Sequence, residues 1–171
     1  MTNFKDYDDA NALFSDQLKI KALPLLSWDF YGIYYQEVNA MLSDAKKIEE
    51  FSVAAQWENP PEWKARLEED HVVVITDPEL TIVFASSNMF RMNGFNPEEV
   101  VGKKPKVFQG MATAPTVRQK IKKAISTEQP FTATLINYSK DGTPYNCYIE
   151  GVPVFNKKGK LSHFMAFEKV A

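Results

Sequence analysis

The chain has 171 residues, 44% of them hydrophobic, which suits one packed domain or one domain with an extension. Its formal net charge of −2 argues against nucleic-acid binding, because such binding needs a dense basic face. Cys147 is the only cysteine, which excludes an intramolecular disulfide and favours a reducing compartment.

Residues 1–58 are predicted to form an all-helical extension, which ends where Pro60 and Pro61 would stop a helix arriving from upstream. Within it, apolar residues recur at helical spacing as far as Ile20. The first residues lack the basic and apolar regions of a signal peptide, and no apolar run approaches the roughly 20 residues of a membrane span. We therefore expect a cytoplasmic protein that does not enter a membrane.

Two further helices are predicted inside the extension. Ser27 is a candidate N-cap for one of them, and Ser43 with Asp44 is predicted to begin the next. The helix that follows Ser27 is aromatic around much of its circumference, so it has to be buried on more than one side. It either caps its own domain or forms an interface with a second copy or a partner, and the sequence leaves both arrangements open.

Residues 59–171 are predicted to form an α+β domain, in which two strands are followed by several helices and then by three strands. Asn96 is a candidate N-cap, because Pro97 and two acidic residues follow it. The order predicts a five-stranded antiparallel sheet with helices on one face. The predicted helices lie at 62–69, from 97 onward and at 114–127, and the strands at 71–76, 81–85, 131–139, 144–155 and 161–170.

Several motifs in this domain occur in the order and spacing of one known family. The segment GKKPKVFQG at 102–110 resembles the signature GxNCRFLQG, and PELTIVFAS, NGFNPEEVVGK, TVRQKI and LINYSKDG lie at matching distances from it. On these motifs, which run from about Val72 to Glu168, the chain resembles PAS domains and, among them, the flavin-binding LOV photosensor domains. In that family the central cysteine of the signature attacks the flavin under blue light. Pro105 stands at this position here and has no nucleophile.

The resemblance also implies which residues would face a flavin ring. Asn137 matches an asparagine that hydrogen-bonds the polar edge of the ring, and its amide can both donate and accept. The second such asparagine falls on Cys147, which is a poorer hydrogen-bond partner. Glu168 stands in the place of a glutamine that relays the signal, and Phe164 and Ala166 occupy positions that face the ring.

Other matched positions surround the signature. Gln109 keeps the family identity, whereas Lys104 replaces the asparagine that precedes the reactive position. Lys106 and Arg118 stand in for the arginines that hold the flavin phosphate, because cations suit an anionic tail. The predicted pocket therefore keeps part of the family pattern and departs from it at Pro105 and at several neighbouring positions.

Two functions remain open at this point. The first is a sensory or regulatory PAS module without photochemistry, which acts through homodimerisation or a partner signalling protein and has room for a small ligand at most. The alternative is a flavin-binding LOV-like redox or light sensor that holds FMN or FAD and forms no cysteinyl adduct.

Other classes are disfavoured. Haem needs an axial ligand, but His163 is predicted to point away from the pocket and His71 precedes the first strand, so both histidines are expected at the surface or at the edge of the core. The sequence contains no paired nucleophile and base, no glycine-rich phosphate loop and no metal-ligand spacing. We therefore do not expect an enzyme.

Overall fold

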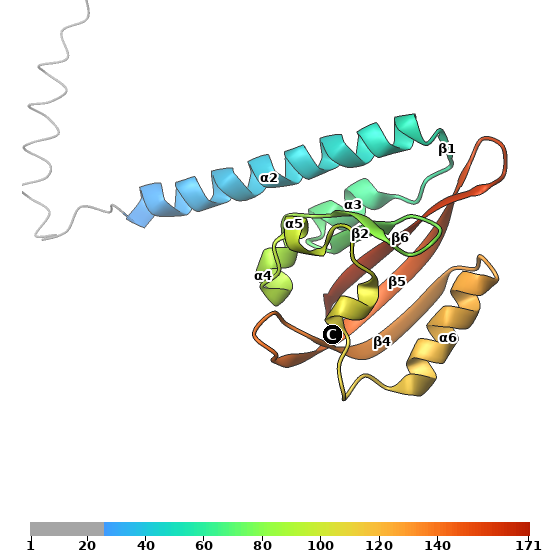
Figure 1. Ribbon diagram of the computed structural model, residues 1–171. Helices are drawn as coiled ribbons and strands as arrows, with labels where there is room; N and C mark the ends of the chain where they lie inside the picture. Colours follow the sequence, from blue (N-terminus) through green and yellow to red (C-terminus); the bar gives the residue numbers. More distant parts are fainter. Residues whose placement is uncertain (1–25) are drawn as a thin grey trace, which may run out of the picture. The chain divides into compact units, whose positions relative to one another are not determined.

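The computed structural model describes the backbone of residues 26–171 and the side chains of residues 32–171 (Figure 1). The helix predicted up to Ile20 lies outside the described residues. Helix α2, Leu26–Ala54, is continuous. The predicted helix start at Ser43 and Asp44 is therefore wrong, and Ser27 lies inside the helix rather than before it. The Asp44 side chain is buried and bonds to another segment instead of capping a helix of its own.

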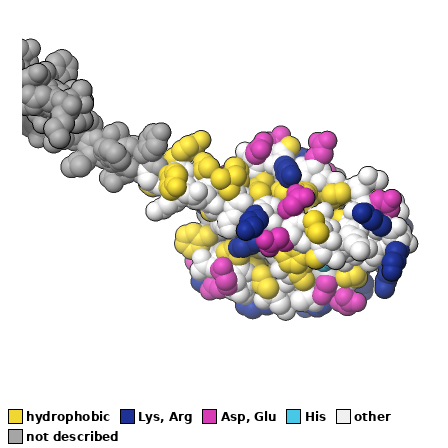
Figure 2. Space-filling view, turned by 90° about the horizontal axis from the view of Figure 1, so that it is seen from above, with side chains coloured by type: hydrophobic (Ala, Val, Ile, Leu, Met, Phe, Trp, Pro, Cys, Tyr) yellow, Lys and Arg dark blue, Asp and Glu magenta, His cyan; other side chains and the backbone are white. Residues whose placement is uncertain are grey.

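Contacts between residues divide the chain into two units, Met1–Gln36 and Glu37–Ala171. Residues 37–58 of the predicted extension thus pack as part of the second unit. In the first unit, the side chains of Ile33, Tyr34 and Tyr35 on α2 are 58%, 66% and 65% exposed. Figure 2 shows hydrophobic side chains gathered on this part of the chain, beside the grey residues. No helix in the described part of the chain is long and apolar enough to cross a membrane.

The second unit is built on the predicted five-stranded antiparallel sheet, and its α+β class is confirmed. The strand order is β3-β2-β6-β5-β4, and the two-residue strand β1 (Trp57–Glu58) pairs with the end of β5, beyond the part that pairs with β4. The strands are β2 (Val72–Thr76), β3 (Ile82–Ala85), β4 (Phe131–Tyr138), β5 (Pro144–Asn156) and β6 (Leu161–Val170).

Five short helices accompany the sheet. The predicted N-cap at Asn96 is confirmed as part of a capping box, in which the Asn96 N–H donates to Glu99 Oε2 at 2.9 Å. The apolar residues of α6 are half-buried rather than fully buried. The helices are α3 (Trp63–Glu68), α4 (Met89–Asn93), α5 (Pro97–Val100), η1 (Pro105–Phe108) and α6 (Pro115–Ser126).

Strand alternation divides the core of this unit into two clusters. Val72 and Val74 lie on what we call the inner face of the sheet, where they pack with residues of α4, α5 and η1. Val73 and Ile75 lie on the outer face, where Ile48 of α2 and two tryptophans, Trp57 and Trp63, complete a second cluster. Helices α4, α5 and η1 thus cover the inner face, and α2 with α3 covers the outer one.

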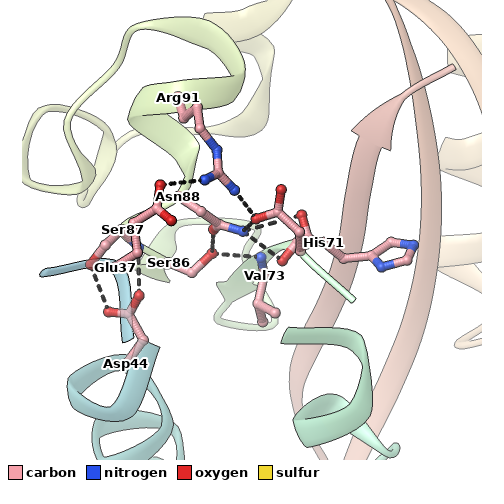
Figure 3. A network of polar contacts seen from close by, with 9 residues as sticks. Glu37, Asp44, His71, Val73, Ser86, Ser87, Asn88 and Arg91 are labelled. Atoms are coloured by element: carbon pink, nitrogen blue, oxygen red, sulfur yellow. Dashed lines mark hydrogen bonds and ion pairs between the residues drawn. The ribbon is translucent and has the colours of Figure 1, made fainter. Parts of the chain in front are cut away.

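A polar network attaches α2 to the loop that precedes α4 (Figure 3). Asp44 accepts hydrogen bonds from the Ser87 N–H at 2.6 Å and from the Ser87 hydroxyl at 3.1 Å. Burial raises the pKa of Asp44, and the two bonds from Ser87 partly offset this effect. About two turns earlier in α2, Glu37 pairs with Arg91 at 2.7 Å, and Arg91 also pairs with Asp70.

The same network continues into the first strand of the domain. Ser86 Oγ accepts from the Val73 N–H at 2.8 Å and donates to Asn88 Oδ1 at 2.6 Å. The Asn88 amide in turn donates to the backbone carbonyls of Asp70 and His71. These bonds connect the beginning of β2, the end of β3 and α2 at one corner of the unit (Figure 3).

Candidate functional site

Five polar residues from four separate elements meet on the inner face. We call them the inner polar cluster: Asn93, Asn137, Tyr145, Cys147 and Glu168. The strand register brings the four strand residues together, because Asn137 pairs with Tyr145 across β4 and β5, and Glu168 lies opposite Ile149 of β5. Asn93 Nδ2 lies 3.4 Å from the Tyr145 hydroxyl, and Cys147 Sγ lies 3.6 Å from Glu168 Oε2.

The cluster is shielded from water, and this changes its acid–base behaviour. The side chain of Glu168 is 5% exposed, and burial raises its pKa to about 7, although the hydrogen bond from Cys147 partly offsets the effect. Burial is also the main reason why the pKa values of Cys147 and Tyr145 lie well above their usual ranges. Near neutral pH the thiol and the phenol are therefore uncharged, and the carboxyl group is divided between its two protonation states.

Two buried oxygen atoms on this face lack a hydrogen-bond partner among the described residues. They are Asn137 Oδ1 and Thr76 Oγ1. Thr76 pairs with Phe164 across β2 and β6, so strand alternation places it on the inner face with Ala166 and Glu168. A buried polar group without a partner costs about 1–3 kcal/mol. A bound molecule with complementary polar atoms would relieve this cost.

The structure brings together five of the residues predicted to line the pocket. Asn137, Cys147, Phe164, Ala166 and Glu168 share the inner face of three adjacent strands. Four of them are fully buried, and Ala166 is half-buried. Their side chains combine an apolar surface with a small number of polar groups, as in a typical small-molecule site.

The residues predicted around the signature lie nearer to solvent. Lys106 of η1 and Arg118 of α6 are exposed, and Gln109, directly after η1, is half-buried. Pro105 is the first residue of η1, a position where its missing N–H is not needed. Lys104 Nζ donates to Thr81 Oγ1 at 3.0 Å and to the Glu79 carbonyl, so this lysine attaches η1 to the β2–β3 turn.

The last four residues of the GKKPKVFQG segment, which we call the VFQG motif, end at Gly110 in close contact with Tyr138 of β4. A Cβ atom on Gly110 would lie 2.4 Å from the Tyr138 ring, so any larger residue would force the ring or the backbone to move. Thr113 Oγ1 accepts from the Gly110 N–H at 3.0 Å and donates to the Ile136 carbonyl at 2.6 Å. The motif therefore has a structural role that does not depend on the residue at its centre.

The two histidines differ from each other. His163 is half-buried on the outer face and accepts a hydrogen bond from Trp57 Nε1 at 3.0 Å, so the prediction that it points away from the pocket is confirmed. The prediction that His71 lies at the surface or the edge of the core is wrong, since it is only 4% exposed. The hydrogen bond from the His71 N–H to the Arg66 carbonyl holds its backbone against α3.

Three residues of this region were not predicted as site residues. Tyr145 shares the strand parity of Cys147, so alternation along β5 is a signal that identifies it. Thr76 is the last residue of β2, and strand alternation places it on the same face as Val72 and Val74. Asn93 comes from helix α4, 52 residues before Tyr145 in the chain, and only the tertiary structure places the two side by side.

A separate cleft of about 270 Å³ lies beside α3. Phe167 lines it and has the opposite strand parity to Glu168, so the cleft belongs to the outer face. Arg66 and Glu150 in its wall pair with each other at 2.7 Å. The cleft is thus distinct from the inner polar cluster.

Curated proteins of similar sequence carry names connected with light sensing. The chain is 40% identical over 110 residues to "Protein TWIN LOV 1" of Arabidopsis thaliana, covering 61% of this chain and 28% of that protein. It is 35% identical over 97 residues to a "Blue-light-activated histidine kinase" of Brucella abortus (55% and 20%) and 33% identical over 93 residues to "Phototropin-2" of Oryza sativa subsp. japonica (54% and 10%). The chain thus spans less than a third of the length of these relatives.

Solved structures agree on the fold. A structure titled "Flavin Analogue Sheds Light on Light-Oxygen-Voltage Domain Mechanism" matches with a TM-score of 0.61 at 24% identity, covering 66% of this chain and 86% of that one. The light-state structure of the Aureochrome1 LOV domain matches with a TM-score of 0.56 at 26% identity, covering 58% and 80%. The family model described as "PAS domain" matches residues 69–169. The chain therefore belongs to the PAS domain family and, within it, resembles the LOV domains.

Proposed function

We propose that this chain is a sensory module whose inner face binds a flavin ring without a covalent bond. The observation that carries the proposal is the buried Asn137 amide, whose Oδ1 lacks a partner among the described residues. The names of the LOV and blue-light relatives support the same class of ligand. They favour this function over the first interpretation of the sequence, a module without photochemistry that acts through dimerisation or a partner and has room for a small ligand.

The residues of the inner face suit the ring but not the adduct chemistry of the family. Asn137 would meet the polar edge of the ring, and Phe164 with Ala166 would supply apolar surface. A bound flavin would supply blue-light absorption and the capacity to accept electrons. Position 105 has no thiol, and burial keeps Cys147 in its unreactive thiol form, so we propose a response without cysteinyl attack.

The exposed cations have a role that depends on the ligand. Lys106 and Arg118 are available to the phosphate of FMN or FAD, because neither belongs to an ion pair among the described residues. Their exposure limits this contribution, since surface charge pairs contribute about 0–1 kcal/mol. The ring should therefore contribute more to affinity than the phosphate does.

The test is the absorption spectrum of the purified chain before and after addition of FMN, followed by removal of the free ligand. The structured blue absorption of oxidised flavin is expected to remain with the protein. Asn137→Ala should weaken binding roughly 5- to 150-fold through loss of about 1–3 kcal/mol. Asn146→Ala is the matched control, because Asn146 lies on β5 with the opposite parity and is exposed. A colourless protein that retains no added flavin would contradict the proposal.

The proposed output is non-enzymatic and passes through α2 to a second copy of the chain or to a partner signalling protein. The exposed side chains of Ile33, Tyr34 and Tyr35 favour this, because clustered apolar exposure marks association surfaces. Light scattering at several concentrations tests it, with a Tyr34→Ser, Tyr35→Ser double variant for comparison. A concentration-dependent mass that the double variant loses is expected for self-association. If the wild type and the double variant both have the mass of a monomer at every concentration, a homodimer is contradicted.

A further inference from the structure

Glu168 lies at the centre of the sheet and not at its edge. Its strand, β6, is hydrogen-bonded to β2 on one side and to β5 on the other, and Glu168 lies between Val72 and Ile149. Its carboxyl group accepts a hydrogen bond from Cys147 Sγ at 3.6 Å, a long contact from a weak donor. Burial removes the hydration of this carboxyl group, and the single weak hydrogen bond offsets only a small part of that free-energy cost.

The groups that face Glu168 carry no positive charge. The titratable ones are Cys147 and Tyr145 of β5, which burial keeps uncharged near neutral pH. β2 places aliphatic Val72 opposite Glu168, and the other members of the inner polar cluster, Asn137 of β4 and Asn93 of α4, are uncharged amides beside Tyr145 and Cys147. None of the ion pairs among the described residues includes Glu168. An unpaired carboxylate is strongly disfavoured in such surroundings, whereas a neutral carboxylic acid is tolerated.

The protonation state decides what this side chain offers to a ligand. A carboxylic acid has one O–H donor, whereas a carboxylate only accepts. The family residue implied at this position is glutamine, whose amide donates at every pH. A carboxylate would turn its lone pairs toward the acceptor atoms of a flavin ring. Glu168 can therefore replace the glutamine as a donor only while it holds a proton.

We propose that Glu168 is the proton-exchanging group of the inner face, which meets a bound heteroaromatic ring as a carboxylic acid and donates a hydrogen bond to an acceptor atom on it. Above neutral pH the empty site holds a carboxylate, so binding takes one proton from solvent onto Glu168. No covalent bond forms or breaks on the ligand. The inference rests on the proposed function, because it concerns the same site.

The experiment measures the affinity of the full chain for riboflavin between pH 5.5 and 9. Riboflavin is the probe because it lacks the phosphate of FMN, whose own second ionisation near pH 6 would add a pH dependence. The wild-type Kd should stay constant at the acidic end and then rise by roughly tenfold per pH unit above the pKa of Glu168. Glu168→Gln should bind with the acidic-end affinity across the range.

Glu150→Gln is the matched control, because Glu150 is a glutamate on the neighbouring strand that faces outward and pairs with Arg66. It should keep the wild-type pH profile. A second measurement needs no variant: mixing riboflavin with wild-type protein in weak buffer at pH 8.5 should take up about one proton for each ligand bound.

The outcomes separate the two proposals. Riboflavin binding with a flat pH profile and no proton uptake would overturn the role of Glu168 and leave the proposed function standing. A Glu168→Gln profile parallel to that of the wild type would also overturn it. Absence of riboflavin binding at every pH, in every variant, would overturn the proposed function and with it this inference.

Discussion

Cys147 Sγ and Glu168 Oε2 lie 3.6 Å apart on adjacent antiparallel strands, and both side chains are buried. The two residues do not face each other directly, because Cys147 pairs with Val170 and Glu168 with Ile149. They meet diagonally, and side chains at this separation on one face of a sheet remain within reach. The thiol is the only hydrogen-bond partner of this carboxyl group among the described residues.

The first prediction concerns stability and pH in the ligand-free protein. The pKa of Glu168 is raised from 4.5 to about 7 in the folded state, so its proton stabilises the fold at low pH. That contribution is complete below pH 4.5 and is lost as the pH rises through 7, with a total change of about 3 kcal/mol. Relative to Glu168→Gln, the wild type should therefore become less stable between pH 5 and pH 8. Urea unfolding of both proteins measures this, and parallel stability profiles would contradict the burial of an ionisable Glu168.

The second prediction concerns the attachment of α2. Asp44→Ala removes the acceptor for the N–H and the hydroxyl of Ser87, and both partly buried donors lose this partner. We expect a loss of about 1–3 kcal/mol in the free energy of unfolding, together with faster amide exchange in α2. Ser43→Ala is the control, because Ser43 is exposed one residue earlier. Equal stability of the two variants would show that the network does not hold the helix.

The third prediction concerns the glycine of the VFQG motif. Gly110→Ala forces a methyl group to within 2.4 Å of the Tyr138 ring, and we expect a cost of about 1–3 kcal/mol. Gly32→Ala is the control. Gly32 lies in helix α2, and a methyl group there has no atom within 4 Å, so the higher helix propensity of alanine should stabilise the protein slightly. Thermal unfolding of the two variants provides the comparison. If both shift the midpoint in the same direction, the close approach to β4 is not what requires glycine.

The fourth prediction concerns thiol reactivity. Cys147 is buried, and its pKa is raised, mainly by burial, so the folded protein should react with an alkylating reagent only slowly. Met111→Cys in a Cys147→Ser background is the reference, because position 111 is fully exposed. Its labelling, followed by mass spectrometry, should be at least roughly a hundredfold faster. Comparable rates would mean that solvent reaches the inner face freely.

Local patterns were sufficient to predict most elements of the second unit. Asn96 is followed by a proline and two acids, and the capping box forms there because each of these groups acts within one turn. The turns at Asp141-Gly142 and at Gly159 join the last three predicted strands, β4 to β5 and β5 to β6, with both glycines at positive φ. The prediction that a new helix starts at Ser43 and Asp44 is wrong. The Asp44 side chain does not cap a helix but accepts a hydrogen bond from Ser87, which lies 43 residues away in the chain.

The sequence alone determined the α+β class, the five strands and the parity that puts Asn137, Cys147 and Glu168 on one face, because hairpin turns and alternation are local properties of the chain. Only the tertiary structure determined which polar atoms lie buried together. It placed Asn93 beside Tyr145, attached α2 through Asp44 and enclosed Glu168 among uncharged groups. These relationships depend on contacts between distant segments, and burial changes the protonation of a carboxyl group only after those segments have packed around it.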